Sequence, residues 1–296
     1  MKRKKIMKKQ KTDLQGMKFG IEIEISNVNY YDLKSAITSR FTGWKVISDC
    51  SVNNGAEIVS PILFYNGQTF QTIKAILEIV KSLDGEADSS TGGHIHVDFK
   101  GYTSQVKNLV KEFFGHQGLL FDVLKVPQTR QHEYCRSIPS HLKNRIKGTR
   151  NQEIMDTSQA VSYLRKLDLT TYSDRYFALN LTSLAKHGTV EFRLFNGSSD
   201  FETWKANIQL SLAIVKKARN AKRSSDKIKE YNNLTARYDM RTWLLRLGFI
   251  GKEFESSRKI FRENLPVFHT DNNKADTAWR YGRKSTAMSG NVPEIS

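Results

Sequence analysis

The stretch Phe19-Gly20-Ile21-Glu22-Ile23-Glu24-Ile25 alternates apolar residues with glycine and glutamate. Because successive side chains of a β-strand point to opposite faces, this pattern predicts a strand with Glu22 and Glu24 side by side on one face. Taken alone, two such glutamates are usually a solvated outer face, since one side of an antiparallel sheet often meets water. Their meaning depends on what the neighbouring strands carry.

A second segment repeats this pattern with other ligand-type side chains. In Gly93-His94-Ile95-His96-Val97-Asp98-Phe99, the two histidines and Asp98 share one strand face, and the apolar residues share the other. Two imidazoles on adjacent positions of one face could bind a metal or an anion, since histidine is a common metal ligand. Two surface histidines without a ligand are an equally good interpretation.

Four further residues extend the pattern to other strands. Glu191 and Arg193 lie together opposite apolar residues in a predicted strand over 189–195, where an isolated pair would be an ordinary exposed ion pair. Asp49 ends one apolar run, and Glu57 enters the next after the turn Asn53-Asn54-Gly55. With Asp98, acidic side chains therefore flank or line five of the predicted strands.

If these strands form one sheet, a single polar face gathers Glu22, Glu24, Glu57, Glu191, His94 and His96. Clustered carboxylates repel one another, and they stay ionised in a folded protein only if cations lie between them. Carboxylates with an imidazole suit Mg²⁺ or Mn²⁺ better than structural zinc, which prefers cysteine and histidine. Such ions ordinarily hold nucleotide phosphates.

The spacing of apolar residues predicts an α+β fold. Period-two alternation predicts strands at Met17–Ser26, Trp44–Asp49, Ala56–Ser60, Gly93–Phe99, Phe177–Leu181 and Thr189–Phe195. Apolar residues at intervals of three and four predict helices at Tyr31–Phe41, Thr69–Leu83 and Ser104–Leu124. We expect one largely antiparallel sheet with these helices on its apolar face.

The chain divides by composition into four parts. Residues 1–16 form a basic arm that we expect to be flexible, because residues 1–12 hold seven Lys and Arg and no acid. Residues 17–200 form the sheet domain, and its basic stretch 127–150 reads as a long functional loop. Residues 201–269 read as a helical appendage, and residues 270–296 as a poorly ordered tail.

Charge and cysteine content limit the class of protein. The 296 residues include 47 Lys and Arg against 30 Asp and Glu, a net charge of +17, so we expect anionic partners. Two cysteines, Cys50 and Cys135, do not support a disulfide framework. No apolar run approaches the length of a membrane span. We therefore expect a cytoplasmic protein that does not bind membranes.

The order of the motifs resembles one known family. The strand E-x-E is followed by D-x-S, G-x-E-I-V-S-P, G-G-H-I-H-V-D, R-x-x-x-L-N and G-T-V-E-F-R. This order resembles the amidoligase family, within the superfamily of glutamine synthetase and glutamate–cysteine ligase, and the segment Met240–Leu245 is also similar to family C-termini. The resemblance implies a curved antiparallel sheet like that of the glutamine synthetase catalytic domain. It also implies an ATP-dependent carboxylate–amine ligase that works through an acyl phosphate and releases ADP and phosphate.

The resemblance also implies ligands for Mg²⁺ and ATP. Glu24, Glu57 and Asp49 would hold one metal ion. A second metal ion would lie on Glu22, His94 and Glu191. Carboxylate and amine substrates of the amino-acid, peptide or polyamine type would complete the reaction.

Other residues would bind phosphates or substrate. The resemblance places His96 near the nucleotide phosphates, Arg193 on the transferring γ-phosphoryl group, and Arg175 on the substrate or a phosphate. Independently of the resemblance, we expect Arg145 and Arg150 of the basic stretch to bind the nucleotide or an anionic substrate. The chain has no G-x-x-x-x-G-K-[ST] motif, so phosphates would be held by metal ions and arginines rather than by a P-loop.

Two other functions fit parts of the sequence. The motif His94-x-His96-x-Asp98 also opens the pattern of metallo-β-lactamase hydrolases, but Phe99 follows where those enzymes have a further histidine. The charge of +17 and the basic stretches 1–11, 143–150 and 216–229 suggest a nucleic-acid-binding protein without ligase activity. Such a protein should interleave base-stacking aromatics with its arginines and lysines.

Overall fold

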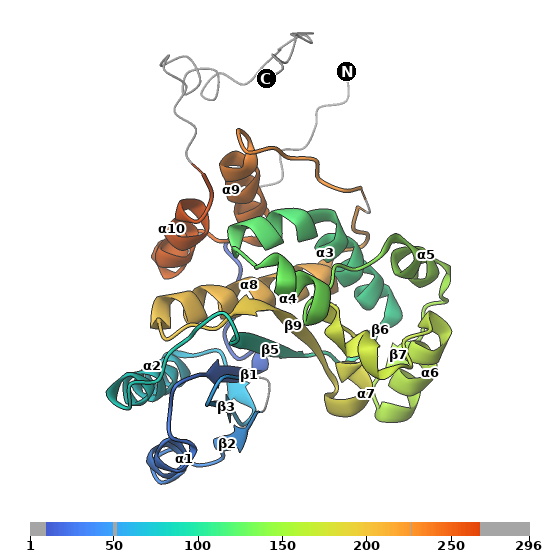
Figure 1. Cartoon of the computed structure of the whole chain (residues 1–296). Coiled ribbons are helices and arrows are strands. Elements are labelled where there is room, and N and C mark those ends of the chain that lie inside the picture. The colour runs from blue at the N-terminus through green and yellow to red at the C-terminus, as the bar shows by residue number, and fades with distance from the viewer. Residues whose placement is uncertain (1–9, 50–51, 226, 267–296) are drawn as a thin grey trace, which may run out of the picture.

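The computed structural model describes residues 10–49, 52–225 and 227–266 (Figure 1). Its main sheet has seven strands in the order β2-β3-β1-β5-β9-β8, and β4 also pairs with β1. These strands are β1 (Lys18–Ile25), β2 (Lys45–Ser48), β3 (Ala56–Val59), β4 (Leu63–Phe64), β5 (Gly92–Asp98), β8 (Leu179–Asn180) and β9 (Thr189–Asn196). Every pairing within the sheet is antiparallel.

The register of the sheet decides which polar side chains are neighbours. Glu24 on β1 lies opposite Glu57 on β3, and Glu22 lies opposite His94 on β5. His96 on β5 lies opposite Glu191 on β9. Because directly opposed side chains of an antiparallel pair are close together, three strand pairs bring acids and histidines into contact.

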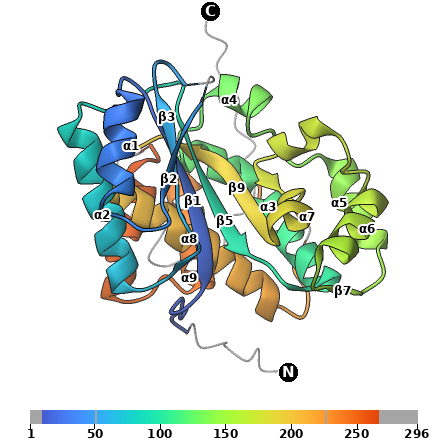
Figure 2. The ribbon, with the colours of Figure 1, turned by 90° about the horizontal axis from the view of Figure 1, so that it is seen from below.

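The apolar face of the sheet is covered by three long helices. They are α2 (Gly67–Ser82), α3 (Thr103–Val123) and α8 (Phe201–Asn220), and Figure 2 shows α3 and α8 behind strands β1, β5 and β9. Ile21, Ile23 and Ile25 of β1 are fully buried in this layer. The predicted α+β fold, with a largely antiparallel sheet and helices on one face, is confirmed.

Side-chain caps fix where these helices begin. The Asn66 side chain accepts a hydrogen bond of 2.8 Å from the Thr69 backbone N–H at the start of α2. Asp200 does the same for the Thr203 N–H at the start of α8, again at 2.8 Å. Each cap satisfies a backbone donor that has no partner within its helix, and so helps to fix where the helix begins.

The predicted loop over 127–150 is wrong, because this stretch contains two helices. They are α4 (Gln128–Glu133) and α5 (Ser140–Gly148), which follow Pro127 and Pro139 respectively. Leu142 and Ile146, four positions apart, are buried on α5. Helices this short show too few turns for their period to be visible in the sequence.

The remaining elements flank the sheet or extend from it. They are α1 (Tyr30–Thr38), β6 (Gly101–Tyr102), β7 (Glu153–Ile154), α6 (Thr157–Leu167), η1 (Tyr172–Tyr176), α7 (Ser183–His187), α9 (Ala236–Leu247), η2 (Lys252–Phe254) and α10 (Glu255–Glu263). In Figure 1, α9 and α10 lie beyond α3 and α8, on the side away from the sheet. None of the described helices is long and apolar enough to cross a bilayer.

Parts of the predicted arm and of the predicted appendage are packed against the rest of the fold. The start of the predicted appendage is α8, whose Trp204 is buried against the sheet, so this part belongs to the core. In the predicted arm, the Thr12 N–H donates to Gly248 O at 2.9 Å, and Leu14 is buried. Residues 1–9, Cys50 and the predicted tail over 270–296 lie outside the described residues.

Candidate active site

Three overlapping groups of possible metal ligands lie on the polar face of the sheet. In each group, one ligand atom from every residue lies within 4.8 Å of the others. The groups are Glu24, Asp49 and Glu57; Glu22, Glu57 and His94; and Glu22, His96 and Glu191. Carboxylate oxygens with at most one imidazole are the donor set of a hard divalent cation, so these residues fit Mg²⁺ or Mn²⁺.

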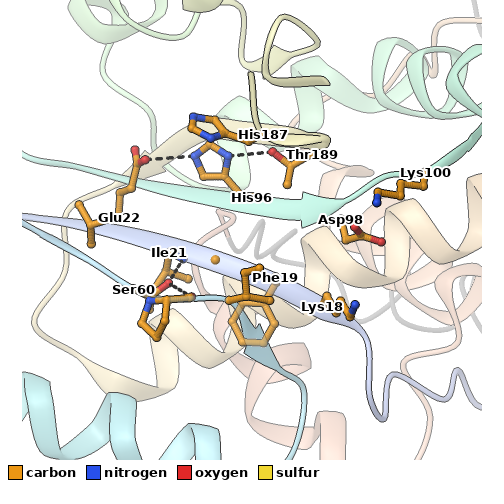
Figure 3. A pocket seen from close by; sticks show the side chains of 14 residues that line it. Lys18, Phe19, Ile21, Glu22, Ser60, His96, Asp98, Lys100, His187 and Thr189 are labelled. Atoms are coloured by element: carbon orange, nitrogen blue, oxygen red, sulfur yellow. Dashed lines mark hydrogen bonds and ion pairs between the residues drawn. The ribbon is translucent and has the colours of Figure 1, made fainter. Parts of the chain in front are cut away.

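The two histidines connect the glutamates of neighbouring strands. His94 Nδ1 lies 2.8 Å from Glu22 Oε2, and His94 Nε2 lies 3.6 Å from Glu24 Oε1. His96 Nε2 lies 3.2 Å from Glu22 Oε1, while its Nδ1 lies 3.1 Å from the Thr189 hydroxyl (Figure 3). Both histidines also lie 4.0 Å from Glu191 Oε1 on β9, and His94 lies 3.9 Å from Glu57 on β3 as well.

A bulge in β9 contributes to this arrangement. Between the pairs Gly93–Phe195 and Ile95–Phe192, β9 has two residues, Arg193 and Leu194, opposite the single His94 of β5. Such bulges re-aim side chains next to functional sites. A Cβ atom on Gly93 would also lie 2.7 Å from the Trp204 ring, so glycine at this position allows α8 to pack closely on the sheet.

Mutual repulsion and burial change the pKa of the acids. Burial, together with Glu22, Glu24 and Asp49, raises the pKa of Glu57 to about 8. Burial opposes ionisation of Glu22 as well, but hydrogen bonds from His94 and His96 hold its pKa well below the usual range. The cluster therefore binds a proton at Glu57 unless another cation takes its place.

Glu191 is held by two donors. Its Oε1 pairs with Arg193 Nη1, and its Oε2 accepts a hydrogen bond of 2.6 Å from Asn180 Nδ2 on β8. Burial opposes ionisation of Glu191, but Arg193 and the two histidines lower its pKa. Arg193 is itself only 5% exposed and lies over the Tyr176 ring, 5.6 Å from its centroid. A buried cation thus stands at the β9 end of the carboxylate cluster.

A second buried arginine, Arg130 on α4, was not predicted. Its Nη1 donates to Phe195 O at 2.7 Å and to Asn196 Oδ1 at 3.2 Å, at the end of β9. A Cβ atom on Gly92 would collide with its Nη2, and the Gly92 N–H donates to Glu24 Oε2 at 2.5 Å. Arg130 therefore lies beside the β1 end of the cluster, where no motif indicated an arginine.

Two cavities open from the cluster, and both are lined by Glu22, His96 and His187. The larger, of about 410 Å³, has apolar walls that include Phe19 and Ile21 (Figure 3). The smaller, of about 250 Å³, is lined by Glu191, Arg175 and Tyr172 among other residues. Arg175 thus lies in a cavity that borders the metal-binding candidates, on the side of η1 and α7.

Arg145 and Arg150 do not line these cavities. They line another cavity with Lys166, and Arg145 Nη1 lies 2.7 Å from Asp168 Oδ2. Neither arginine lines a cavity at the carboxylate cluster, and their role in nucleotide binding stays a prediction. Asp98, the third residue of the hydrolase motif, is in none of the three possible metal groups, and its Oδ2 lies 3.8 Å from Arg219.

Comparison with known proteins identifies the family. The family described as "Putative amidoligase enzyme" matches residues 43–215, more than half of the chain. The chain belongs to the amidoligase family. The matched part of this amidoligase includes Glu57, His94, His96, Glu191 and Arg193, whereas Glu22 and Glu24 precede it. The family resemblance noted from the motifs is confirmed.

Other comparisons add little. No curated protein matches the amidoligase chain. A bifunctional glutathione synthetase from Pasteurella multocida is similar in structure, with a TM-score of 0.42 and 11% sequence identity, over 84% of this chain and 48% of that chain. The chain thus spans about half the length of that structure. A likeness this low assigns neither fold nor activity.

Proposed function

We propose that this amidoligase is an ATP-dependent carboxylate–amine ligase that forms an amide bond through an acyl phosphate. One observation carries the proposal: three overlapping groups of carboxylates and histidines lie on one sheet face beside a buried arginine. Phosphoryl transfer needs little covalent help from a protein, but it needs charge held in place around the phosphates. This face supplies both the ligands for cations and a cation of its own.

The ligands form two proposed metal sites. Glu24, Asp49 and Glu57 hold one Mg²⁺, as the family motifs imply. Glu22, His94 and Glu191 hold another, again as the motifs imply, since His94 Nδ1 lies 2.8 Å from Glu22 Oε2 and 4.0 Å from Glu191 Oε1. His96 is a second imidazole near the same two glutamates, with its Nε2 3.2 Å from Glu22 Oε1 and 4.0 Å from Glu191 Oε1. Bound Mg²⁺ would supply charge neutralisation for the nucleotide phosphates.

The chain's own cations act beside these sites. Arg193, held by Glu191, presents a buried positive charge toward the transferring γ-phosphoryl group. Arg175 lines the 250 Å³ cavity and binds the carboxylate substrate or a phosphate there. Both arginines keep their charge throughout, so neither has to gain or lose a proton during the reaction.

The reaction balances in two steps. An oxygen of the substrate carboxylate attacks the γ-phosphorus of ATP, and ADP leaves. The amine nitrogen then attacks the acyl carbon, and the C–O bond to phosphate breaks. One oxygen of the substrate carboxylate therefore ends in the released phosphate.

The test follows that oxygen. Protein, ATP and Mg²⁺ are incubated with a library of amino acids, peptides and polyamines, and condensed products are identified by mass. With ¹⁸O in the carboxylate of the substrate found, one label should appear in the released phosphate, together with ADP. Formation of AMP and pyrophosphate, or phosphate without label in a coupled reaction, would refute this route.

A further inference from the structure

Three cavities, not two, meet at His187. A third cavity of about 420 Å³ shares His187 and Lys100 with the 410 Å³ cavity, and His187 and Lys186 with the 250 Å³ cavity. The His187 ring lies edge-on to His96, with ring centroids 5.6 Å apart (Figure 3). The third cavity therefore adjoins the carboxylate cluster through a single imidazole.

This third cavity, which we call the β7 cavity, differs from the other two in its lining. It lies among β7, α7 and the end of β5, and none of Glu22, His96 and Glu191 lines it. Phe99, Ile154, Met155 and Leu184 contribute apolar surface, and Met155 is 50% exposed. A ligand here would lie against an apolar wall, in a cavity that Glu22, His96 and Glu191 do not line.

The charges of the β7 cavity favour a carboxylate. Lys100 and Lys186 line it, and neither forms an ion pair with any residue that the structure describes. Asp156 is its one acidic lining residue, and that side chain accepts the Gln159 N–H at 2.8 Å as the cap of α6. Two uncompensated ammonium groups attract an anionic group and repel a polyamine.

A ligase of the proposed kind needs three places, for ATP, for the carboxylate and for the amine. The first two must border the metal-binding residues, because phosphate and acyl oxygen react there. The attacking amine must keep its lone pair free, and a metal ion would take that lone pair. The β7 cavity is adjacent to the cluster and lacks its ligands, which is what the amine requires.

We infer that the β7 cavity binds the amine substrate, and that this substrate is an α-amino acid with an apolar side chain; the inference rests on the proposed ligase function. Its carboxylate pairs with Lys100 or Lys186, and its side chain packs on Met155 and the buried residues behind it. Its amino group then points past His187 toward the cluster. Its ammonium group first gives one proton to water, which frees the lone pair; the nitrogen then forms the new C–N bond as the C–O bond to phosphate breaks, and the second proton that it loses goes to the phosphate.

The first test measures binding without turnover. L-leucine and spermidine are titrated into the full chain with Mg²⁺ and a non-hydrolysable ATP analogue, and binding is followed by calorimetry and by shifts of methionine methyl signals. Leucine should bind, and spermidine should bind at least about tenfold more weakly, a difference of ~1.4 kcal/mol. Tighter binding of spermidine than of leucine overturns the inference.

Substitutions at one exposed position separate charge from packing. Met155→Glu should weaken leucine binding by about tenfold or more, because a carboxylate faces the ligand's own carboxylate. Met155→Lys removes the same apolar contact but adds an attractive charge, so it should weaken leucine binding less. The matched control is Leu234→Glu, which adds the same acid at an exposed position 64% accessible and outside the three cavities. Equal leucine affinity in all four proteins overturns the assignment.

Kinetics then separate this inference from the proposed function. In the coupled reaction, Met155→Glu should raise the KM for the amine and change the KM for ATP much less. If no pair of substrates yields ADP, the proposed function fails. Leucine binding, and its loss in Met155→Glu, still show whether the β7 cavity binds an apolar amino acid. If ligation occurs but Met155→Glu leaves the amine KM at the parent value, the proposed function stands and this inference is wrong.

Discussion

Glu24 on β1 and Glu57 on β3 are direct register partners, and an oxygen of each lies within 4.8 Å of the other and of Asp49. Two carboxylates opposed in this way cannot both remain ionised at low cost in a buried position. The fold holds them together nonetheless, because the apolar faces of both strands are buried beneath them. Local destabilisation of this kind is common where a protein binds a cation.

The first prediction concerns pH. The pKa of Glu57 is raised from 4.5 to about 8 by burial and by its acidic neighbours, so the folded protein holds a proton that the unfolded chain releases. The contribution of Glu57 to stability is therefore complete below about pH 4.5 and is lost as the pH rises toward 8. Urea unfolding of the metal-free protein across this range should show falling stability, and Glu57→Gln should flatten the slope. A Glu57→Gln profile parallel to that of the parent contradicts the prediction.

Binding of Mg²⁺ should remove the proton from Glu57. Because Mg²⁺ must displace the Glu57 proton, its binding at pH 7 should release protons to the buffer. Calorimetry in two buffers of different ionisation enthalpy measures the number released. Glu57→Gln should show markedly smaller release, and Glu78→Gln, at an exposed position on α2, should match the parent.

The second prediction separates two glutamates with similar proposed roles. Glu24→Gln and Glu191→Gln should each lower kcat by orders of magnitude, since each removes a proposed metal ligand. Their stabilities should differ. Glu24→Gln keeps an oxygen to accept the Gly92 N–H and relieves repulsion, whereas Glu191→Gln leaves buried Arg193 without its counter-charge and should cost about 3–5 kcal/mol.

Thermal unfolding in EDTA checks that contrast. Glu24→Gln should melt at or above the parent temperature, and Glu191→Gln well below it. Normal turnover in either variant would show that the residue is not part of the active site. A Glu191→Gln variant as stable as the parent would show that Arg193 has another partner.

The third prediction concerns Arg130 as a positioning residue. Arg130→Lys keeps the charge but cannot donate in the same way to Phe195 O and Asn196 Oδ1, so it should cost about 1–3 kcal/mol of stability. If Arg130 also positions Glu24 through Gly92, the Mg²⁺ concentration for half-maximal activity should rise. Arg246→Lys, at an exposed position on α9, is the matched control. Lower stability with an unchanged Mg²⁺ requirement would make Arg130 merely structural.

The fourth prediction concerns a buried hydrogen-bond network away from the carboxylate cluster. Glu112 on α3 accepts hydrogen bonds from Lys217 at 2.5 Å and from Trp243 at 2.6 Å, so it ties α8 and α9 to α3. Glu112→Leu should lower the free energy of unfolding by about 3–5 kcal/mol, because both donors lose a buried acceptor. Denaturant unfolding followed by tryptophan fluorescence measures the loss. A change below about 1 kcal/mol, the worth of a typical exposed pair, would contradict it.

The sequence by itself determined which side chains share a face. Alternation with period two is a property of the extended backbone, so Glu22, Glu24, His94, His96, Glu191 and Arg193 could be assigned to one face before any pairing was known. The approximate positions of the long strands and helices followed from the same periodicities, as for the helix expected at 69–83 and found at Gly67–Ser82. Family membership followed from the order of these motifs.

Tertiary structure alone decided which of these residues meet. That His94 and His96 both lie near Glu22 and Glu191 depends on the register of β5 with its two neighbours and on the bulge in β9 opposite His94, and neither leaves a period in the sequence. Arg130 reaches the cluster from a six-residue helix too short to be recognised, and the β7 cavity is built by three separate segments, at 99–100, 154–157 and 184–188. Neighbouring residues determine local backbone geometry, whereas contacts between distant segments depend on how the whole core packs.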